Sequence, residues 1–181
     1  SSDGTSWTSR NSGTSKSLYG VYYGNNQFVA VGESGTILTS SDGTSWTSRT
    51  SGTSQNLYGV YYGNNQFVAV GGLGTILTSS DGTSWTSRTS GTSQPLHGVS
   101  YGGSTFVAVG ESGTILTSSD GTSWTSRTSG TSQYLYDADY GNNQFVAVGG
   151  LGTILTSSDG TSWTSRNSGT SKQLNEVTHI E

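Results

Sequence analysis

The sequence predicts an all-β fold built from a repeated four-stranded unit, and three observations support this class. The octet SSDGTSWT occurs five times in the 181-residue chain, first at Ser1 and then every 39 residues. Apolar or β-branched runs such as FVAVG and GTILT recur at the same period, which argues against disorder in spite of the polar composition. The β-branched content and the 28 glycines disfavour helices.

Each unit contains four short runs that read as strands, separated by turn residues. Asn-Asn, Gly-Gly and Asp-Gly pairs mark the turns, because Asn and Gly accept the positive φ angles of tight hairpins. Complete copies span 1–39, 40–78, 79–117 and 118–156, and a partial copy spans 157–181. In the second unit we expect strands at Leu57–Gly63, Gln66–Gly71, Gly74–Ser80 and Ser84–Thr89. They are called strands a to d below, from the first in the unit to the last.

Four antiparallel strands in about 40 residues form the blade of a β-propeller. The sequence therefore predicts one propeller domain over 1–181, with a β-solenoid or a sandwich as the alternatives. Strand a should be innermost, because it is apolar or aromatic on both faces, and strand d should be the polar outer edge. The complete blades are expected at about 18–50, 57–89, 96–128 and 135–167.

The two termini predict a partial fifth blade. Its outer strand would come from about Ser6–Arg10 and its inner strand from Leu174–Ile180, while its two middle strands are absent. Strands a and d are not neighbours in a blade, so they cannot pair directly. We therefore expect either an imperfect five-blade ring or a homo-oligomer that completes the propeller.

The repeated octet resembles the Asp-box, or BNR repeat, of sialidase-type and related bacterial propellers. The longer string VGGLGTILTSSDGTSWT is similar to repeats of the Ycf48-like photosystem II assembly factors. The box is one residue shorter here than the family pattern. The resemblance implies a hairpin between the two outer strands. We expect its aspartate to accept hydrogen bonds from its own turn and its tryptophan to fold between sheets. These structural residues are Asp3, Trp7, Asp42, Trp46, Asp81, Trp85, Asp120, Trp124, Asp159 and Trp163.

Composition and spacing exclude several functions. A net charge of −4 with seven basic residues argues against nucleic-acid binding. No segment has the apolar length or the basic amphipathic pattern of a membrane-binding element, and there is no cysteine. The unit repeats one arginine, at Arg10, Arg49, Arg88, Arg127 and Arg166, which spreads these side chains around a ring and prevents a sialidase-like arginine cluster. We therefore expect a protein that is not an enzyme and needs no cofactor. The location of the protein stays open, and the sequence favours a secreted or cell-surface location only weakly.

Ligands are expected on the face built by the d–a loops and the b–c turns, opposite the Asp-box hairpins. Hydroxyl, amide and carboxylate groups beside tyrosines suit lectin-like glycan binding between blades. The alternatives are a protein-interaction module, as the assembly-factor resemblance implies, and a structural or engineered repeat without an evolved ligand. The candidate ligand-binding residues are Glu33, Glu111, Gln55, Gln94, Gln133, Tyr19, Tyr58 and Tyr136.

The repeats disagree most in strand a, where the last copies introduce carboxylates. Asp137 and Asp139 lie two residues apart and therefore point to the same side of a strand. Glu176 occupies the position of Asp137 in the next copy. The sequence predicts that these oxygens either hold a Ca²⁺ ion in the central channel or adapt the chain to the place where its symmetry breaks.

Overall fold

The repeats fold as four antiparallel four-stranded sheets, in a computed structural model that describes residues 3–179. In each sheet the strands lie in chain order. The first blade contains β1 (Leu18–Gly24), β2 (Gln27–Gly32), β3 (Ile37–Ser40) and β4 (Thr47–Arg49). The second contains β5 (Leu57–Gly63), β6 (Gln66–Gly71), β7 (Ile76–Ser79) and β8 (Thr86–Arg88). The third contains β9 (Leu96–Gly102), β10 (Thr105–Gly110), β11 (Ile115–Ser118) and β12 (Thr125–Arg127). The fourth contains β13 (Leu135–Gly141), β14 (Gln144–Gly149), β15 (Ile154–Ser157) and β16 (Thr164–Arg166).

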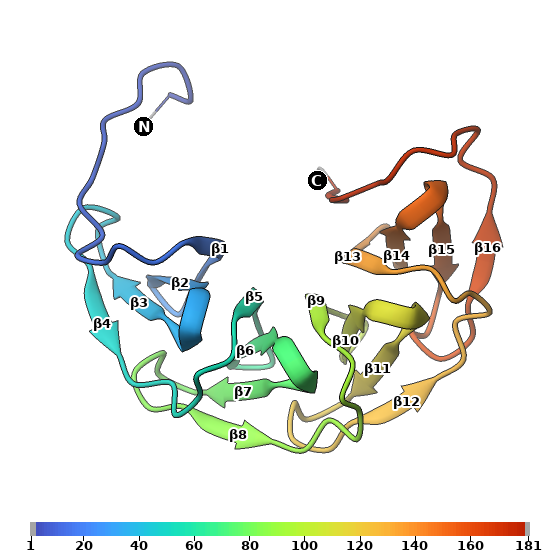
Figure 1. Cartoon of the computed structure of the whole chain (residues 1–181), viewed down its shortest axis with the longest axis horizontal. Coiled ribbons are helices and arrows are strands. Elements are labelled where there is room, and N and C mark those ends of the chain that lie inside the picture. Colours follow the sequence, from blue (N-terminus) through green and yellow to red (C-terminus); the bar gives the residue numbers. More distant parts are fainter. Residues whose placement is uncertain (1–2, 180–181) are drawn as a thin grey trace.

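The four blades stand side by side in an open arc, with the first strand of each blade on the inner side (Figure 1). This arrangement confirms the predicted all-β propeller architecture and its four-stranded blades. The ring is not closed, because the first and fourth blades lie at opposite ends of the arc and the two termini lie apart (Figure 1). The five-blade ring that was one of the two expectations is therefore not formed.

The N-terminal segment does not form the outer strand that the repeat pattern predicts. Residues 6–10 have no strand structure, and the side chain of Trp7 is 81% exposed. The physical reason is that strand d of a blade pairs with strand c, as β4 pairs with β3. No strand c precedes residue 6 in the described chain, so this segment has no strand to pair with.

The C-terminal segment, residues 174–179, takes the place of the inner strand of a further blade. At the three blade junctions, the glycine that ends strand a packs directly against a tyrosine of the next blade, as Gly24 does against Tyr62. His179 packs against Gly141 in the same way. The backbone N–H of Leu174 also donates to the carbonyl of Gly149, at 3.0 Å. The segment is not assigned as a strand, because no neighbouring strand pairs with it, and Ile180 lies outside the described residues.

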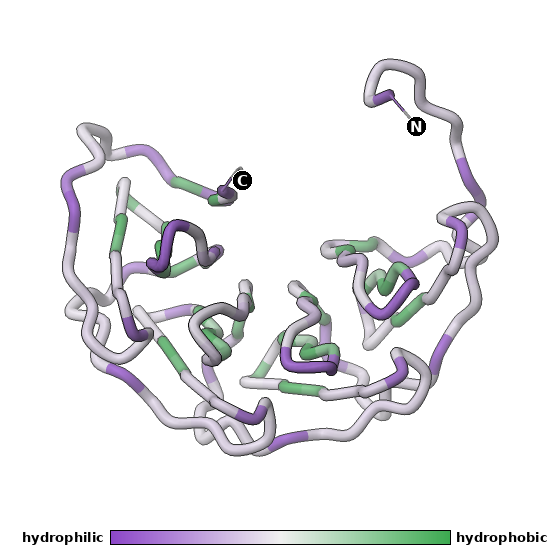
Figure 2. The backbone as a smooth tube through the Cα atoms, turned by 180° about the vertical axis from the view of Figure 1, so that it is seen from behind, coloured by the Kyte–Doolittle hydropathy of each residue, from purple (hydrophilic) through white to green (hydrophobic). Residues whose placement is uncertain are grey.

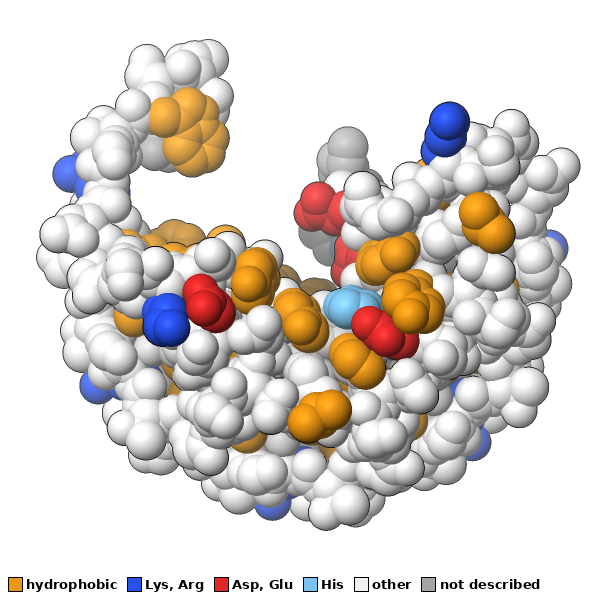
Figure 3. Space-filling view, viewed as in Figure 1, with side chains coloured by type: hydrophobic (Ala, Val, Ile, Leu, Met, Phe, Trp, Pro, Cys, Tyr) orange, Lys and Arg blue, Asp and Glu red, His pale blue; other side chains and the backbone are white. Residues whose placement is uncertain are grey.

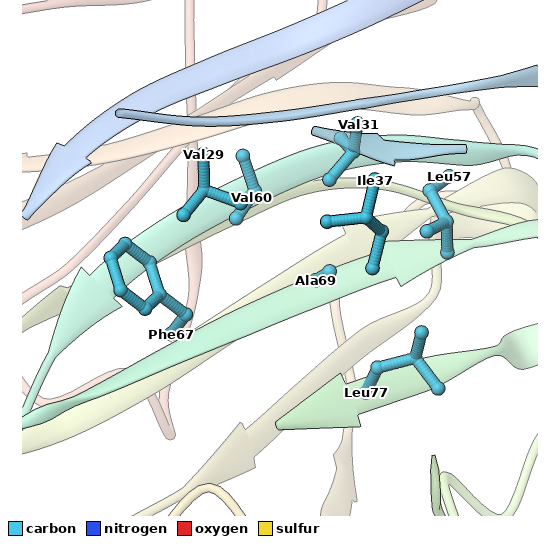
Figure 4. Close-up of a cluster of buried hydrophobic side chains, with 8 residues drawn as sticks. All are labelled: Val29, Val31, Ile37, Leu57, Val60, Phe67, Ala69 and Leu77. Atoms are coloured by element: carbon cyan, nitrogen blue, oxygen red, sulfur yellow. The ribbon is translucent and has the colours of Figure 1, made fainter. Parts of the chain in front are cut away.

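The core lies between the blades. One cluster joins Val29, Val31 and Ile37 of the first blade to Leu57, Val60, Phe67, Ala69 and Leu77 of the second (Figure 4). Equivalent clusters join the second blade to the third and the third to the fourth. Burial of a Val, Leu or Phe side chain is worth about 1.5–3 kcal/mol, so these junctions hold the arc together. Figure 2 shows the hydrophobic segments within the strands of the blades and the hydrophilic ones mainly in the turns and the outer connections.

The turn between strands b and c is a short 3₁₀ turn, at Glu33–Gly35 in the first blade. Gly35 has φ +72°, and a side chain there would collide with the carbonyl of Thr53. The glycine thus lets the b–c turn pack tightly against the following d–a loop. Among the described residues, no helix has the length and apolar character required to cross a membrane.

Candidate ligand-binding site

An aromatic arc lines the mouth of the central channel. Its four members occupy one position in the repeat, the second residue of strand a, and lie in chain order around the inner edge: Tyr19, Tyr58, His97 and Tyr136. Neighbouring ring centroids are 5.6, 5.1 and 5.7 Å apart, and the rings are tilted against each other. Figure 3 shows hydrophobic side chains gathered around this inner edge, with acidic side chains and a histidine among them.

The sequence placed three of these residues in the site and omitted His97. That residue replaces a tyrosine of the repeat and continues the row between Tyr58 and Tyr136. Its Nε2 lies 3.6 Å from Oε1 of Glu111. Burial lowers the pKa of His97, and the carboxylate of Glu111 opposes this shift. The 39-residue spacing was the signal that could have assigned His97 to the arc.

The two predicted glutamates lie at the b–c turns, beside the arc. Glu33 forms an ion pair with Lys16, with 3.6 Å between Nζ and Oε1. Glu111 faces His97, as described above. Glu33 is therefore paired with a lysine of a d–a loop, and Glu111 is paired with a histidine of strand a.

The predicted glutamines do not reach the channel. The backbone N–H groups of Gln55, Gln94 and Gln133 each donate to a threonine Oγ1 two residues earlier, which orders the d–a loop. The side chain of Gln133 lines a separate groove of about 490 Å³ between the fourth blade and the C-terminal segment. Tyr134, Tyr136, Lys172 and Gln173 also line this groove. Gln133 and Tyr136 thus line the same groove, and none of the three glutamines is among the residues that line the channel cavity described below.

Below the arc, the channel forms a cavity of about 530 Å³. Asp137, Asp139 and Glu176 line it together with the tyrosines of strand a, and no lysine or arginine is among its lining residues. Tyr22 and Tyr61 pack against each other at its wall, with ring centroids 4.2 Å apart and ring planes tilted by 36°. Burial raises the pKa of Tyr61 well above its ordinary range, helped by a hydrogen bond with Tyr22.

Asp137 and Asp139 anchor the C-terminal segment. Oδ2 of Asp137 accepts from the backbone N–H of Val177 at 3.0 Å, and Oδ2 of Asp139 accepts from that of His179 at 2.9 Å. Nδ1 of His179 also lies 2.8 Å from Oδ2 of Asp139. Burial raises the pKa of Asp137 to about 6, and the nearby Glu176 and Asp139 carboxylates add to the increase.

The expected calcium site is not assembled in the described part of the chain. No group of three or more His, Cys, Asp and Glu side chains there is arranged to hold a metal ion. The reason is that the two aspartates direct oxygens to backbone N–H groups of residues 177 and 179. The two aspartates thus bind the C-terminal segment at the place where the repeat symmetry ends.

The Asp-box hairpins lie at the opposite end of the blades. Oδ1 of Asp81 accepts from the N–H groups of Thr83 and Ser84, at 2.8 and 2.9 Å. These hydrogen bonds lower the pKa of Asp81. The hairpin is also an inter-blade contact that the sequence did not reveal, because Gln27 Nε2 donates to the carbonyl of Asp81 at 2.8 Å.

The box tryptophans are half-buried in the four blades, where each packs near a phenylalanine of strand b. The ring centroids of Phe67 and Trp85 are 6.4 Å apart, and the indole N–H donates to the carbonyl of Gly82 at 3.0 Å. Trp7 departs from this pattern. It lies outside any blade and remains exposed, although it keeps a 3.2 Å hydrogen bond to Gly4.

Comparisons with known proteins show the fold. No protein-family model matches the chain, and no curated protein matches it. Among solved structures, one of YCF48 bound to D1 peptide is 20% identical with a TM-score of 0.60, covering 88% of this chain and 53% of that one. The computationally designed Ika4 protein is 17% identical with a TM-score of 0.67, covering 80% and 92%.

A third solved structure, an ancestral GH74 enzyme, is 17% identical with a TM-score of 0.67, covering 88% of this chain and 25% of that one. YCF48 from Cyanidioschyzon merolae is 19% identical with a TM-score of 0.65, covering 84% and 56%. The chain thus spans about half the length of the two YCF48 structures. At these sequence identities, the similarities to solved structures establish the propeller fold alone.

Proposed function

We propose that the chain is a non-catalytic binding scaffold that holds a basic peptide segment of a partner protein at the mouth of the channel. One observation carries this proposal: aromatic rings and three carboxylates line the cavity, and no lysine or arginine does. Such a surface attracts a cationic side chain, because both a carboxylate and the face of an aromatic ring interact favourably with a positive charge.

The geometry suits an extended ligand better than a compact one. The members of the aromatic arc follow one another at intervals of 5.1 to 5.7 Å along the inner edge. An extended peptide crossing this row would turn alternate side chains toward the rings, and each cation–π contact is worth about 0.5–2 kcal/mol. Peptide binding has a structural precedent on this fold in the YCF48 structure named above.

A defined pair of probes tests the proposal. The peptide acetyl-Gly-Arg-Gly-Tyr-Gly-Arg-Gly-amide, labelled with fluorescein, should bind, whereas the same peptide with Glu in place of Arg should not. Fluorescence anisotropy would measure both dissociation constants. Tyr58→Ala should weaken binding by about tenfold, because it interrupts the row at a contact worth about 1.4 kcal/mol. The control Leu151→Ala removes an exposed side chain outside the channel and should leave binding unchanged. Equal affinity for the Arg and Glu peptides would refute the proposal.

A second candidate, lectin-like glycan binding, is favoured by the groove beside the fourth blade. It is lined by Tyr134, which no other repeat carries, and by amide and ammonium groups from Gln133, Gln173 and Lys172. An aromatic face with hydrogen-bonding groups around it suits a sugar ring. A glycan array tests this candidate, with Tyr134→Ala expected to abolish any signal and Tyr58→Ala expected to preserve it. Silence on the array would reject glycan binding. Silence with both probes would favour a structural repeat without a ligand.

A further inference from the structure

Two equivalent cavities lie beside the outer strands of the second and fourth blades, and none of their lining residues lines the channel. The cavity of the second blade measures about 460 Å³ and that of the fourth about 320 Å³. Each is lined by the leucine of the b–c turn, the arginine of strand d and hydroxyl residues of the d–a loop. In the second blade these are Leu73, Arg88, Ser90 and Thr92, and their counterparts stand two repeats later. We call the two cavities the rim sites.

Each rim site presents a leucine in an unfavourable conformation. Leu73 has φ +51° and Leu151 has φ +53°, in the left-handed region that residues with a side chain rarely adopt. Their side chains are nevertheless 65% and 67% exposed, so they contribute little to the core. The third blade follows the second in the arc, so the exposure of Leu73 does not depend on where the arc ends. Backbone outliers of this kind collect at functional sites.

The first and third blades carry a different b–c turn. Theirs reads Glu-Ser-Gly, whereas that of the second and fourth blades reads Gly-Leu-Gly. The exchange removes a carboxylate and adds an aliphatic side chain, while the arginine of strand d is present in all four blades. Among the described residues that line the rim sites, none is aspartate or glutamate. Two of the four blades thus offer a surface that is both apolar and positively charged.

The arginine of each rim site is oriented and lacks an anionic partner. Nε of Arg88 donates to Oγ1 of Thr78 at 2.8 Å, and Nε of Arg166 makes the equivalent bond at 2.9 Å. No arginine takes part in an ion pair within the described part of the chain. With Nε engaged, the two terminal amino groups of the guanidinium remain to donate to both oxygens of one carboxylate.

The d–a loop forms a wall that its own hydrogen bonds hold in place. Oγ of Ser90 donates to the carbonyl of Thr92 at 3.1 Å, and Oγ1 of Thr92 accepts from the N–H of Gln94 at 3.0 Å. The fourth blade repeats both bonds, each at 3.1 Å. Because these hydroxyls are engaged, the arginine and the leucine are the groups that select a ligand. A wall that is already ordered also loses little freedom on binding.

We propose that each rim site binds an acidic peptide segment of a partner protein, with a carboxylate on the arginine and an aliphatic side chain against the leucine. An extended segment makes both contacts when its acidic and aliphatic residues are two positions apart, because alternate side chains point to the same side. A sugar acid suits the site less well, since the loop hydroxyls that would hold its hydroxyl groups are already bonded. The rim sites share no residue with the channel, so this proposal is independent of the basic peptide proposed there.

Isothermal titration calorimetry of the full chain with the peptide acetyl-Gly-Glu-Gly-Leu-Gly-Glu-Gly-amide tests the proposal. The wild type should bind two peptides per chain, and Arg88→Gln should bind one. The double variant Arg88→Gln/Arg166→Gln should bind none, because loss of a bidentate, charge-assisted contact weakens each site by more than about tenfold. The same peptide with Gln in place of Glu should not bind the wild type.

The repeat supplies matched controls. Nε of Arg127 makes the same structural hydrogen bond, to Oγ1 of Thr117 at 2.8 Å, but its blade carries Glu111 and Ser112 in the b–c turn. Arg127→Gln should therefore still bind two peptides. Leu73→Ser introduces the residue of the first and third blades, so it should keep the fold and remove one site. The double variant Glu111→Gly/Ser112→Leu should create a third site.

Three results would overturn the proposal: no binding by the wild type, equal affinity for the Glu and Gln peptides, or the same loss in Arg127→Gln as in Arg88→Gln. Binding of polygalacturonate by a wild type that ignores the peptide would also overturn it, in favour of an acidic sugar. The double arginine variant should bind the arginine peptide of the channel test as the wild type does, so the two proposals fail separately. Any binding of the glutamate peptide of that test at the rim sites should vanish in the same variant.

Discussion

Replacing Asp137 by asparagine should make the protein more stable at neutral pH and remove part of its pH dependence. The carboxyl group lines the channel, where it accepts hydrogen bonds from the backbone of Val177 and Ala138. Glu176 and Asp139 are close enough to oppose its charge. Asparagine keeps an oxygen acceptor for the Val177 N–H and removes the charge. It therefore imitates the protonated acid at every pH.

The magnitude follows from the change in pKa. Burial raises the pKa of Asp137 from 3.8 to about 6 in the folded protein. Each pKa unit corresponds to about 1.4 kcal/mol, so ionisation costs the folded state about 3 kcal/mol. Between pH 3.8 and 6 the folded state binds more protons than the unfolded state, and its stability therefore falls as the pH rises. The free energy of unfolding of Asp137→Asn should match the wild type near pH 4 and exceed it by about 3 kcal/mol above pH 7.

Urea denaturation followed by circular dichroism from pH 4 to pH 8 measures this difference. Asp120→Asn is the control with the opposite sign, because backbone hydrogen bonds lower the pKa of Asp120. Its removal should cost stability, and the deficit should stay nearly constant from pH 4 to pH 8, because it shrinks only when the pH falls below 3.8. A difference between wild type and Asp137→Asn that stays constant from pH 4 to pH 8 would refute the burial argument.

Three further predictions concern the Asp-box motif and the turn glycines. Asp81→Ala should lower the melting temperature, because it removes the acceptor for two backbone N–H groups in a blade. Asp3→Ala should not lower it, because the turn of Asp3 belongs to no sheet. Thermal unfolding of both variants checks this difference. Gly74→Ala should destabilise the chain more than Gly91→Ala: both glycines have positive φ, which costs alanine about 1 kcal/mol, but only Gly74 is packed against a backbone carbonyl. Equal midpoints in urea would contradict this packing argument. Trp7→Phe should remove the fluorescence component that acrylamide quenches most readily, because that indole is 81% exposed, and unchanged quenching would show that the indole is covered in solution.

Local sequence signals predicted the blades well because each signal acts within one repeat. The expected strands Leu57–Gly63 and Gln66–Gly71 coincide with β5 and β6. The two outer strands were expected a few residues too long, since β8 covers only Thr86–Arg88. Turn residues and β-branched runs fix such elements through nearby backbone geometry, and hydrogen bonding trims their ends.

Features that depend on contacts between repeats were harder to predict. The bond from Gln27 to the carbonyl of Asp81 joins residues 54 positions apart, and nothing in either motif indicates it. The role of Asp137 and Asp139 as anchors also needed the path of the C-terminal segment. Trp7 lies in a complete copy of the motif but remains exposed, because its burial depends on a neighbouring sheet that the motif does not supply.

The near identity of the three blade junctions has a consequence for how the chain reaches its native state. Because the clusters use equivalent residues, the first blade would pack on the third almost as favourably as on the second. Only the connection distinguishes the correct partner: seven residues separate β4 from β5, so the adjacent blade is always at the highest local concentration. Refolding from denaturant should therefore pass through misassembled states in which blades pair out of order. Synthesis from the N-terminus, which presents one blade at a time, would avoid them.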